Sequence, residues 1–393
     1  MKILKNKHLL FFTSLCFLLC LSVGNVSNIP LVTAINYENS FHHSHIESAG
    51  AWEITQGYKN ITVAIIDSGI DYSHPDLTQI GWTNLGEIFN NSIDDDSNGY
   101  VDDYYGWDFV SNDSVPGPEV DDPVHWHATF IAGIIAAPKD DDGIVGVAPN
   151  VTVMNVRILL SNNYAGTSDE DFGKAIRYAV DNGADVINLS LQYYSNSPYI
   201  HSAIQYAVAN GVPVVSVPGN TALPTGGREY VSYPGAYEEV ICVGATNINK
   251  QKADYSNYGA WVDLVAPVGD EASINIRSTA PPDQYWTGWG TSFACPQVAA
   301  TIAMMRSLNY SLTVDEIKYI LYESAIDVED PGKDILTGYG LLNASKAVRA
   351  VLDPSVLITP TSAGFSNILF FPAILVTIGC IVVILRKKKS FRD

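Results

Sequence analysis

The central part of the chain alternates between short apolar runs and amphipathic segments. Five runs are rich in valine and isoleucine and apolar at nearly every position, as strands buried on both faces are: 61–67, 151–159, 185–191, 213–219 and 240–246. Three segments with helical periodicity lie between and after them, at 169–183, 197–211 and 313–325. This alternation predicts a single α/β domain on a doubly wound parallel sheet, with ligands at the carboxyl ends of the strands.

The predicted helices begin at residues that commonly cap helices. Ser168 and Ser197 precede the first two, and Pro198 suits the first turn of the second helix. Thr313 and Glu316 have the spacing of a capping box at the start of the third. These signals fix where the helices start more firmly than apolar periodicity alone.

Both ends of the chain carry apolar segments that are separate from the fold. Three lysines precede the apolar run from Leu9 to Val23, which is the pattern of a secretory signal peptide. Near the other end, an apolar segment long enough to span a bilayer is followed by four consecutive cations at 386–389. Basic flanks stay on the cytoplasmic side, so we expect a single-pass protein of the cell membrane whose α/β domain is extracellular.

These features divide the chain into six segments. They are a signal peptide (1–34), an N-terminal extension (35–60), the α/β domain (61–352), a Pro/Ser/Thr linker (353–364), a transmembrane helix (365–385) and a basic cytoplasmic tail (386–393). The linker is short, so the domain is expected to stay near its membrane.

The charge of the chain argues against a nucleic acid partner. The net charge is −20, and the part between the two basic ends carries 14 basic and 41 acidic residues. A surface of this sign repels phosphate backbones. Only Cys242 and Cys295, of five cysteines, lie outside the apolar ends, which excludes a disulfide framework and predicts two buried thiols.

Four polar residues stand at predicted strand ends or helix starts. Asp67 ends an apolar strand, and Asn220 follows a glycine at the end of another. His127 precedes an apolar helix rich in small residues, and Ser292 opens a second helix of this kind. Peptide hydrolysis requires a nucleophile, a base for its proton, an acid that orients the base, and donors for the oxyanion. Each requirement has a candidate in this set.

With their flanking segments these residues resemble the subtilisin-like serine protease family, over roughly residues 51–352. The resemblance rests on IIDSGID, HATFIAGIIAA, PVVSVPGN and GWGTSFACPQVAA, and on the chain order Asp, His, Ser. It implies a serine endopeptidase acting on proteins or peptides. In that enzyme Asp67 orients the imidazole of the general base, which is His127 rather than His125. Ser292 is the nucleophile, and the Asn220 side chain donates a hydrogen bond to the oxyanion.

The sequence departs from the family pattern at two places. Ala128 and Phe130 replace a glycine and a second histidine after the proposed base. In the segment NLSLQYY, Gln192 and Tyr193 replace two glycines. In the family this backbone edge pairs with the substrate and borders the primary specificity pocket. We therefore expect the side chains of Gln192 and Tyr193 to narrow this pocket, and the sequence does not predict which substrate residue is preferred.

An acidic loop, IDDDSNGYVDDYYG, predicts a cation site. Asp94, Asp96 and Asn98 alternate before a glycine as in the first half of an EF-hand loop, although the twelfth position holds Tyr105 instead of glutamate. Crowded carboxylates repel each other unless a cation is present. Similar segments in calcium-dependent subtilisin relatives favour structural calcium, with the candidate ligands Asp94, Asp96, Asn98, Tyr100, Asp102 and Asp103. The alternative is a solvated acidic turn.

Three other functions remain open at this stage. The chain is alternatively a catalytically inactive binding protein on the same fold, since fold alone does not establish activity. It is alternatively a peptide ligase or cyclase that uses the same acyl-enzyme, which product mass spectrometry would distinguish. A calcium-dependent adhesion module is the third. The intact set of Asp67, His127, Ser292 and Asn220 favours hydrolysis over the two idle alternatives.

Overall fold

The structure is a computed structural model that describes residues 40–119, 125–140, 142–159, 167–220, 229–270 and 274–358. The predicted signal peptide, the second half of the linker (359–364), the transmembrane helix and the basic tail lie outside these residues. Within the described ranges, no helix is long and apolar enough to cross a membrane.

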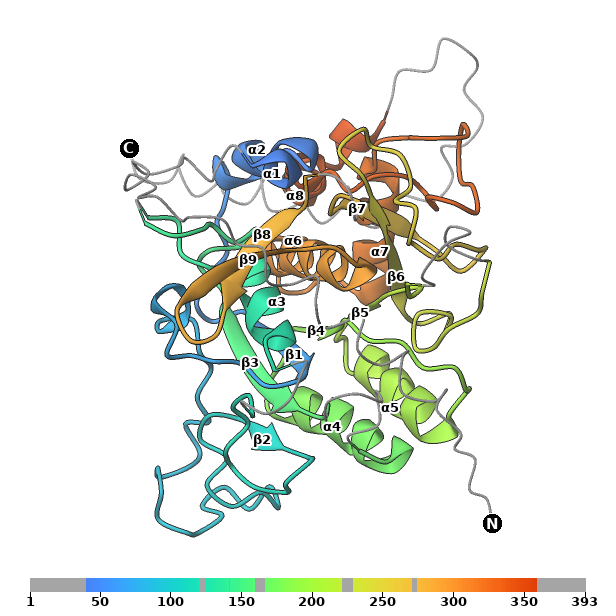
Figure 1. The fold of residues 1–393 in the computed structure, drawn as a ribbon. Coiled ribbons are helices and arrows are strands. Elements are labelled where there is room, and N and C mark those ends of the chain that lie inside the picture. The colour runs from blue at the N-terminus through green and yellow to red at the C-terminus, as the bar shows by residue number, and fades with distance from the viewer. Residues whose placement is uncertain are drawn as a thin grey trace, which may run out of the picture.

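A seven-stranded parallel sheet forms the centre of the molecule (Figure 1). Its strand order is β2–β3–β1–β4–β5–β6–β7, and every pairing is parallel. The strands are β1 (Thr62–Asp67), β2 (Trp107–Asp108), β3 (Thr152–Arg157), β4 (Val186–Leu189), β5 (Val214–Ser216), β6 (Ile241–Thr246) and β7 (Leu264–Pro267). All five predicted strands are present, which confirms the α/β fold with a parallel sheet.

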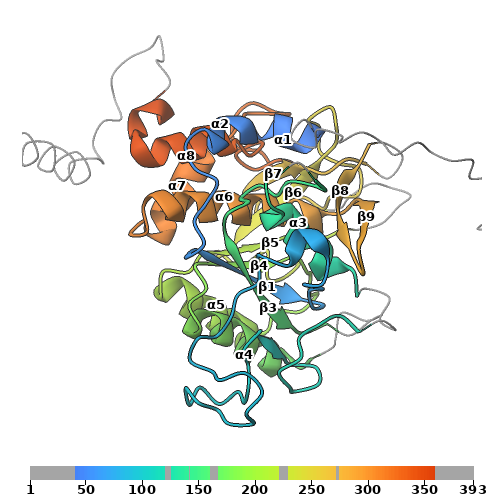
Figure 2. The ribbon, with the colours of Figure 1, turned by 90° about the vertical axis from the view of Figure 1, so that its left-hand side faces the viewer.

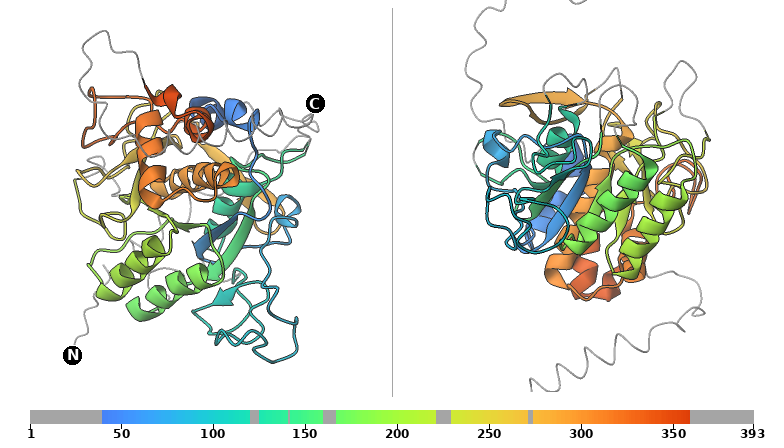
Figure 3. Two further views of the ribbon diagram at one scale, coloured as in Figure 1. Left: turned by 180° about the vertical axis from the view of Figure 1, so that it is seen from behind. Right: turned by 90° about the horizontal axis from the view of Figure 1, so that it is seen from below.

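Helices cover both faces of this sheet, with α3 and α6 on one face and α4 and α5 on the other (Figures 1 and 3). Successive residues of β1 alternate between two cores: Val63 and Ile65 join the core with α3 and α6, whereas Ala64 and Ile66 join the core with α4 and α5. Burial on both faces explains why most positions of the strands are apolar. The helices are α3 (His127–Ala136), α4 (Asp169–Asp181), α5 (Pro198–Ala209) and α6 (Cys295–Leu308).

The helix caps agree with the sequence in two of three cases. The Ser168 hydroxyl accepts a hydrogen bond from the backbone of α4, and Thr313 and Glu316 form the complete capping box of α7. Ser197 stands at the N-cap of α5 without a side-chain capping bond. The other elements are α1 (Phe41–His45), α2 (Ser48–Trp52), η2 (Pro75–Leu77), β8 (Ile276–Ala280), β9 (Gln284–Gly288), η3 (Thr291–Phe293), α7 (Val314–Ser324), α8 (Ala344–Leu352) and η4 (Pro354–Leu357).

The topology brings β1 to the middle of the sheet. The chain leaves β1 for β3 on one side and then crosses to β4 on the other. The α/β rule places ligand sites at the carboxyl ends of strands where the strand order reverses in this way. Asp67, the last residue of β1, therefore stands at the edge where a site is expected.

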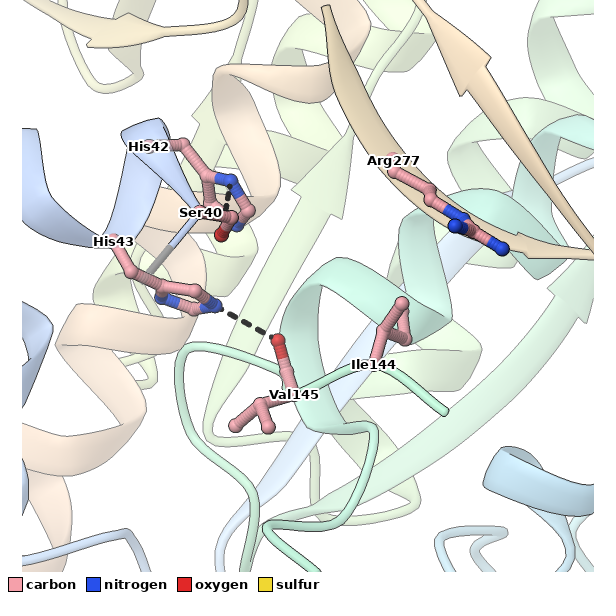
Figure 4. Close-up of a pocket in the computed structure, with 6 residues that line it drawn as sticks. All are labelled: Ser40, His42, His43, Ile144, Val145 and Arg277. Atoms are coloured by element: carbon pink, nitrogen blue, oxygen red, sulfur yellow. Dashed lines mark hydrogen bonds between the residues drawn. The ribbon is translucent and has the colours of Figure 1, made fainter. Parts of the chain in front are cut away.

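The segment before β1, assigned to an extension in the sequence analysis, packs into the domain. Ile46 and Ala51 are fully buried, and α2 lies against α8 (Figure 2). The His43 Nε2–H donates to the Val145 carbonyl at 2.9 Å (Figure 4), and its Nδ1 lies 2.9 Å from the Ser48 hydroxyl. Because a carbonyl oxygen only accepts, the proton of a neutral His43 is on Nε2.

The burial of the neighbouring His42 predicts that folding is sensitive to acid. Its burial, with smaller contributions from the nearby His43 and His45, holds the pKa of His42 well below the usual value. Arg277 lines the same small cavity and adds no compensating negative charge (Figure 4). In the unfolded chain the pKa returns to about 6.5, so below that pH the unfolded state gains a proton that the folded state rejects.

We therefore expect His42→Asn to reduce the fall in Tm between pH 7.5 and pH 5.5. Acidification removes stability from the wild type through His42, whereas asparagine does not titrate. Thermal melts at both pH values give the comparison. Between pH 7.5 and 8.5, where the imidazole is neutral in both states, the two proteins should show equal changes. An equal loss of Tm at pH 5.5 would show that His42 does not contribute.

Candidate active site

A buried carboxylate at the end of β1 holds an imidazole at the start of α3. Asp67 is fully buried, and its two oxygens lie 2.9 and 3.0 Å from the His127 Nδ1. The Asp67 Oδ1 also accepts a hydrogen bond from the backbone N–H of Ser68 at 2.7 Å. The sequence analysis placed these two side chains on separate segments, and the fold brings them together.

This hydrogen bond determines the tautomer of His127. A carboxylate only accepts, so the proton of a neutral His127 lies on Nδ1 and leaves the Nε2 lone pair available. The backbone is fixed as well, because the Ala128 N–H donates to the Ser68 hydroxyl at 3.1 Å and the rest of α3 is buried. His127 therefore presents a basic nitrogen from a rigid helix start.

Ser292 lies in the short helix η3, immediately before α6. Its hydroxyl donates to the Ser190 carbonyl at 3.2 Å, and the Ser190 hydroxyl donates to the Ser292 carbonyl at 2.8 Å. The next residue, Phe293, packs against His127 with ring centroids 5.7 Å apart. Ser292 is thus beside His127, with its hydroxyl turned toward the end of β4.

Asn220 is bound to the same turn through its side chain. Its Oδ1 accepts hydrogen bonds from the Thr291 backbone N–H at 2.8 Å and from the Thr291 hydroxyl at 3.0 Å. A backbone N–H requires an acceptor, so the amide orientation is determined and Nδ2 is the outer atom. Nδ2 lies beside Gly290, next to the turn that carries Ser292.

The supporting residues of the site were not identified from the sequence. Ser68, Ser190 and Thr291 hold the three functional loops, and all three are buried. Serine and threonine at loop positions carry no distinctive spacing, so only their contacts reveal these roles.

Cys295, the first residue of α6, is also buried, and burial raises the pKa of its thiol. Both described cysteines are free. The expected buried thiols are confirmed.

Aromatic side chains form one wall of the site. Phe130, at the position where the family has a histidine, packs against Phe293 at a tilt, with centroids 4.4 Å apart. Trp126, just before His127, packs on both and lies 5.9 Å from Trp286 of the β8–β9 hairpin. Trp126 and Phe293 also contact the His127 ring, so this apolar packing helps to hold the imidazole.

The acidic loop brings together a different set of carboxylates from the one that the spacing indicated. Oxygens of Glu87, Asp96 and Asp103 lie within 4.8 Å of one another. Glu87, which the sequence analysis missed, lies seven residues before the acidic run and is nearly buried. Asn98 is adjacent, with its Nδ2 3.1 Å from an Asp103 oxygen. Asp96, Asp103 and Asn98 were among the predicted ligands.

The other predicted ligands have structural partners. Asp94 accepts hydrogen bonds from the backbone of Asn98 and Gly99, and Asp102 accepts them from the backbone of residues 91 and 92. The Tyr100 ring packs against Trp107, Phe109 and Tyr178. These side chains shape the loop around the Glu87–Asp96–Asp103 cluster.

The cluster has the chemistry of a site for a hard cation. Its donors are all oxygen atoms, which suits Ca²⁺ or Mg²⁺. Asp103 is fully buried, and burial raises the pKa of its carboxyl although Tyr178, Asn84 and Asn98 hydrogen bond to it. A cation would stabilise the charged form that burial disfavours. The residues present therefore fit structural calcium.

Comparison with known proteins agrees with this geometry. A model of the Subtilase family matches residues 58–340. The chain is 36% identical to the thermophilic serine proteinase of Bacillus sp. (strain AK1) over 76% of its length and 64% of that protein. It is 32% identical to subtilisin DY of Bacillus licheniformis, over 75% of this chain and 93% of that one.

A third relative, the intracellular serine protease of Paenibacillus polymyxa, is 33% identical over 76% of this chain and 82% of that protein. The match to the family model includes the segments that carry Asp67, His127, Asn220 and Ser292. The chain therefore belongs to the Subtilase family, and it is a serine endopeptidase of the subtilisin type.

Proposed function

We propose that this protein hydrolyses peptide bonds of protein or peptide substrates through an acyl-enzyme on Ser292. The observation that supports this most strongly is the His127–Asp67 hydrogen bond at a buried strand end, beside the turn of Ser292. In this proposal Asp67 orients His127, His127 is the general base and Asn220 stabilises the oxyanion.

Acylation begins when the Ser292 hydroxyl turns from the Ser190 carbonyl toward the His127 Nε2. The proton passes to Nε2 while Oγ bonds to the substrate carbonyl carbon. The buried Asp67 carboxylate stabilises the imidazolium that forms. The imidazolium then gives this proton to the leaving amine as the C–N bond breaks, and water repeats the sequence to release the acid.

The developing negative charge falls on the carbonyl oxygen. The Asn220 Nδ2 is oriented by the two hydrogen bonds that Thr291 donates to its Oδ1. A donor held in place in this way needs no reorganisation when the charge develops, which is why such donors accelerate acyl transfer. The Ser292 N–H at the start of the helical turn is the second donor.

The first test is covalent labelling. A fluorophosphonate should modify Ser292 in the wild type, and Ser292→Ala should abolish both labelling and peptidase activity. In subtilisin itself, loss of the nucleophile costs about 10⁶-fold in kcat, and we expect a loss of that order. Ser311→Ala, at an exposed serine far from the site, is the matched control and should label normally. Labelling of a different serine in the mutant would remove Ser292 from the nucleophile role.

We also propose that the enzyme is secreted and remains attached to the cell membrane with its active site outside. The basic leader with its apolar run and the C-terminal apolar segment with its cations support this topology. Proteolytic shaving of intact cells should release the domain through the linker. Protection of the domain in intact cells would contradict the topology.

Structural calcium is the third part of the proposal. Glu87, Asp96 and Asp103 would hold the ion, since their oxygens already converge. Bound calcium would neutralise carboxylates that repel one another in a chain whose net charge is already −20. The loop lies between β1 and α3 in the sequence, so its order affects the two elements that carry Asp67 and His127.

Calcium should therefore raise the Tm of the wild type by several degrees at about 100 times its dissociation constant, a stabilisation of about 2.7 kcal/mol. The double variant Asp96→Asn, Asp103→Asn should lose this response. Asp95→Asn is the matched control, because Asp95 lies in the same loop but outside the cluster. Thermal melts with calcium and with a chelator measure the effect. Equal melting of the wild type under both conditions would favour the solvated acidic turn.

A further inference from the structure

Gln192 links two backbone segments that border the nucleophile. It lies three residues beyond β4, where the sequence departs from the family glycine. Its Oε1 accepts a hydrogen bond from the Asn220 backbone N–H at 3.0 Å. That donor fixes the amide orientation, so Nε2 is the outer atom, and it donates to the Tyr194 hydroxyl at 2.6 Å. The Gln192 amide is thus held through both its oxygen and its nitrogen.

The Gln192 amide occupies space that only a glycine leaves open. A Cβ on Gly219 would lie 1.8 Å from the Gln192 Oε1 and 2.8 Å from its Cδ. Gly219 has a φ of +96°, which also favours glycine. The amide therefore rests directly on the Gly219 α-carbon and fills the gap between the segment that follows β4 and the one that follows β5.

Tyr194 holds this arrangement from the solvent side. Its ring contacts Tyr230 edge to face, with centroids 5.7 Å apart. Gln192 itself is half-buried, whereas the Tyr194 ring is 65% exposed. A side chain entering the gap must therefore displace a hydrogen-bonded amide and cannot simply move a loose surface group.

The position of the reacting atoms shows which part of a substrate meets Gln192. The leaving amine must lie on the His127 side, because His127 gives it a proton. The acyl part consequently extends away from His127, past Ser190, whose carbonyl contacts the Ser292 hydroxyl. With the carbonyl oxygen directed toward Asn220, the proposed mechanism places the first acyl side chain on the side of Gln192, which is bound to the Asn220 backbone.

We propose that Gln192 is a specificity-determining residue that restricts the residue on the acyl side of the scissile bond to small side chains, such as alanine, glycine or serine. This inference rests on the proposed function of Ser292, His127 and Asn220. A large side chain breaks the hydrogen bonds of Gln192 to Asn220 and Tyr194 and leaves the Asn220 N–H without its acceptor, which disfavours binding. A small side chain fits without moving the amide.

The test uses two tetrapeptide p-nitroanilides that differ only in the last residue, alanine or phenylalanine. The wild type should show the higher kcat/KM with alanine. Gln192→Gly opens the gap and should raise the phenylalanine-to-alanine ratio of kcat/KM by about tenfold to a hundredfold, the range of hydrophobic pocket discrimination. A ratio is used because a change in Asn220 position slows both substrates alike.

Two further variants test whether the hydrogen bonds of Gln192 to Asn220 and Tyr194 are what hold its side chain in the gap. In Gln192→Glu the carboxylate can accept hydrogen bonds from both the Asn220 N–H and the Tyr194 hydroxyl, so the preference for alanine should remain. Tyr194→Phe removes one anchor and should raise the ratio by less than Gln192→Gly does. Gln205→Ala, at an exposed residue of α5, is the matched control and should leave the ratio unchanged.

Labelling with a small fluorophosphonate separates this inference from the proposed function. If Ser292 is labelled but the wild type cleaves the phenylalanine substrate as well as the alanine substrate, Gln192 does not restrict specificity. An unchanged ratio in Gln192→Gly overturns the inference in the same way. If Ser292 is not labelled and neither substrate is cleaved, the proposed function fails, and the inference fails with it.

Discussion

The arrangement of the site depends on one buried carboxylate. Asp67 has no exposed surface, and an unpaired charge in that position would be strongly destabilising. The fold satisfies it with the Ser68 backbone N–H and the His127 Nδ1. These partners join the end of the central strand to the start of α3 and determine the His127 tautomer. The same interaction therefore stabilises the fold locally and leaves the His127 Nε2 lone pair available for its proposed role as the base.

A second set of contacts joins the proposed nucleophile, Ser292, to the segments that follow β4 and β5. Ser190 after β4 and Asn220 after β5 bind the turn that contains Thr291 and Ser292. Gln192 lies two residues after Ser190, and its side chain accepts a hydrogen bond from the Asn220 backbone N–H. One backbone edge thus contacts the proposed nucleophile, orients the proposed oxyanion donor and carries Gln192. In our proposals, specificity and catalysis therefore depend on the same group of hydrogen bonds.

The sequence predicted the features that depend on local pattern. The buried strands are apolar at most positions, and the capping residues of α4 and α7 act over three residues, so both could be recognised. Contacts between segments that are far apart in the sequence could not be predicted. Glu87 joins Asp96 and Asp103 only because the loop folds back, and the contact of Gln192 with Asn220 spans 28 residues and needs Gly219 beneath it. The departure at Gln192 and a narrower pocket could be predicted, but the hydrogen bonds that hold the Gln192 amide could not.

The central claim is that the Ser292 hydroxyl attacks the substrate carbonyl. His127 accepts the proton of this hydroxyl, and Asn220 stabilises the oxyanion that forms on the carbonyl oxygen. A crystal structure of the fluorophosphonate adduct tests this most directly. The account predicts phosphorus bonded to the Ser292 Oγ, with a phosphoryl oxygen within hydrogen-bonding distance of the Asn220 Nδ2 and the His127–Asp67 hydrogen bond intact. A phosphoryl oxygen directed away from Asn220, or an adduct on another residue, would contradict it.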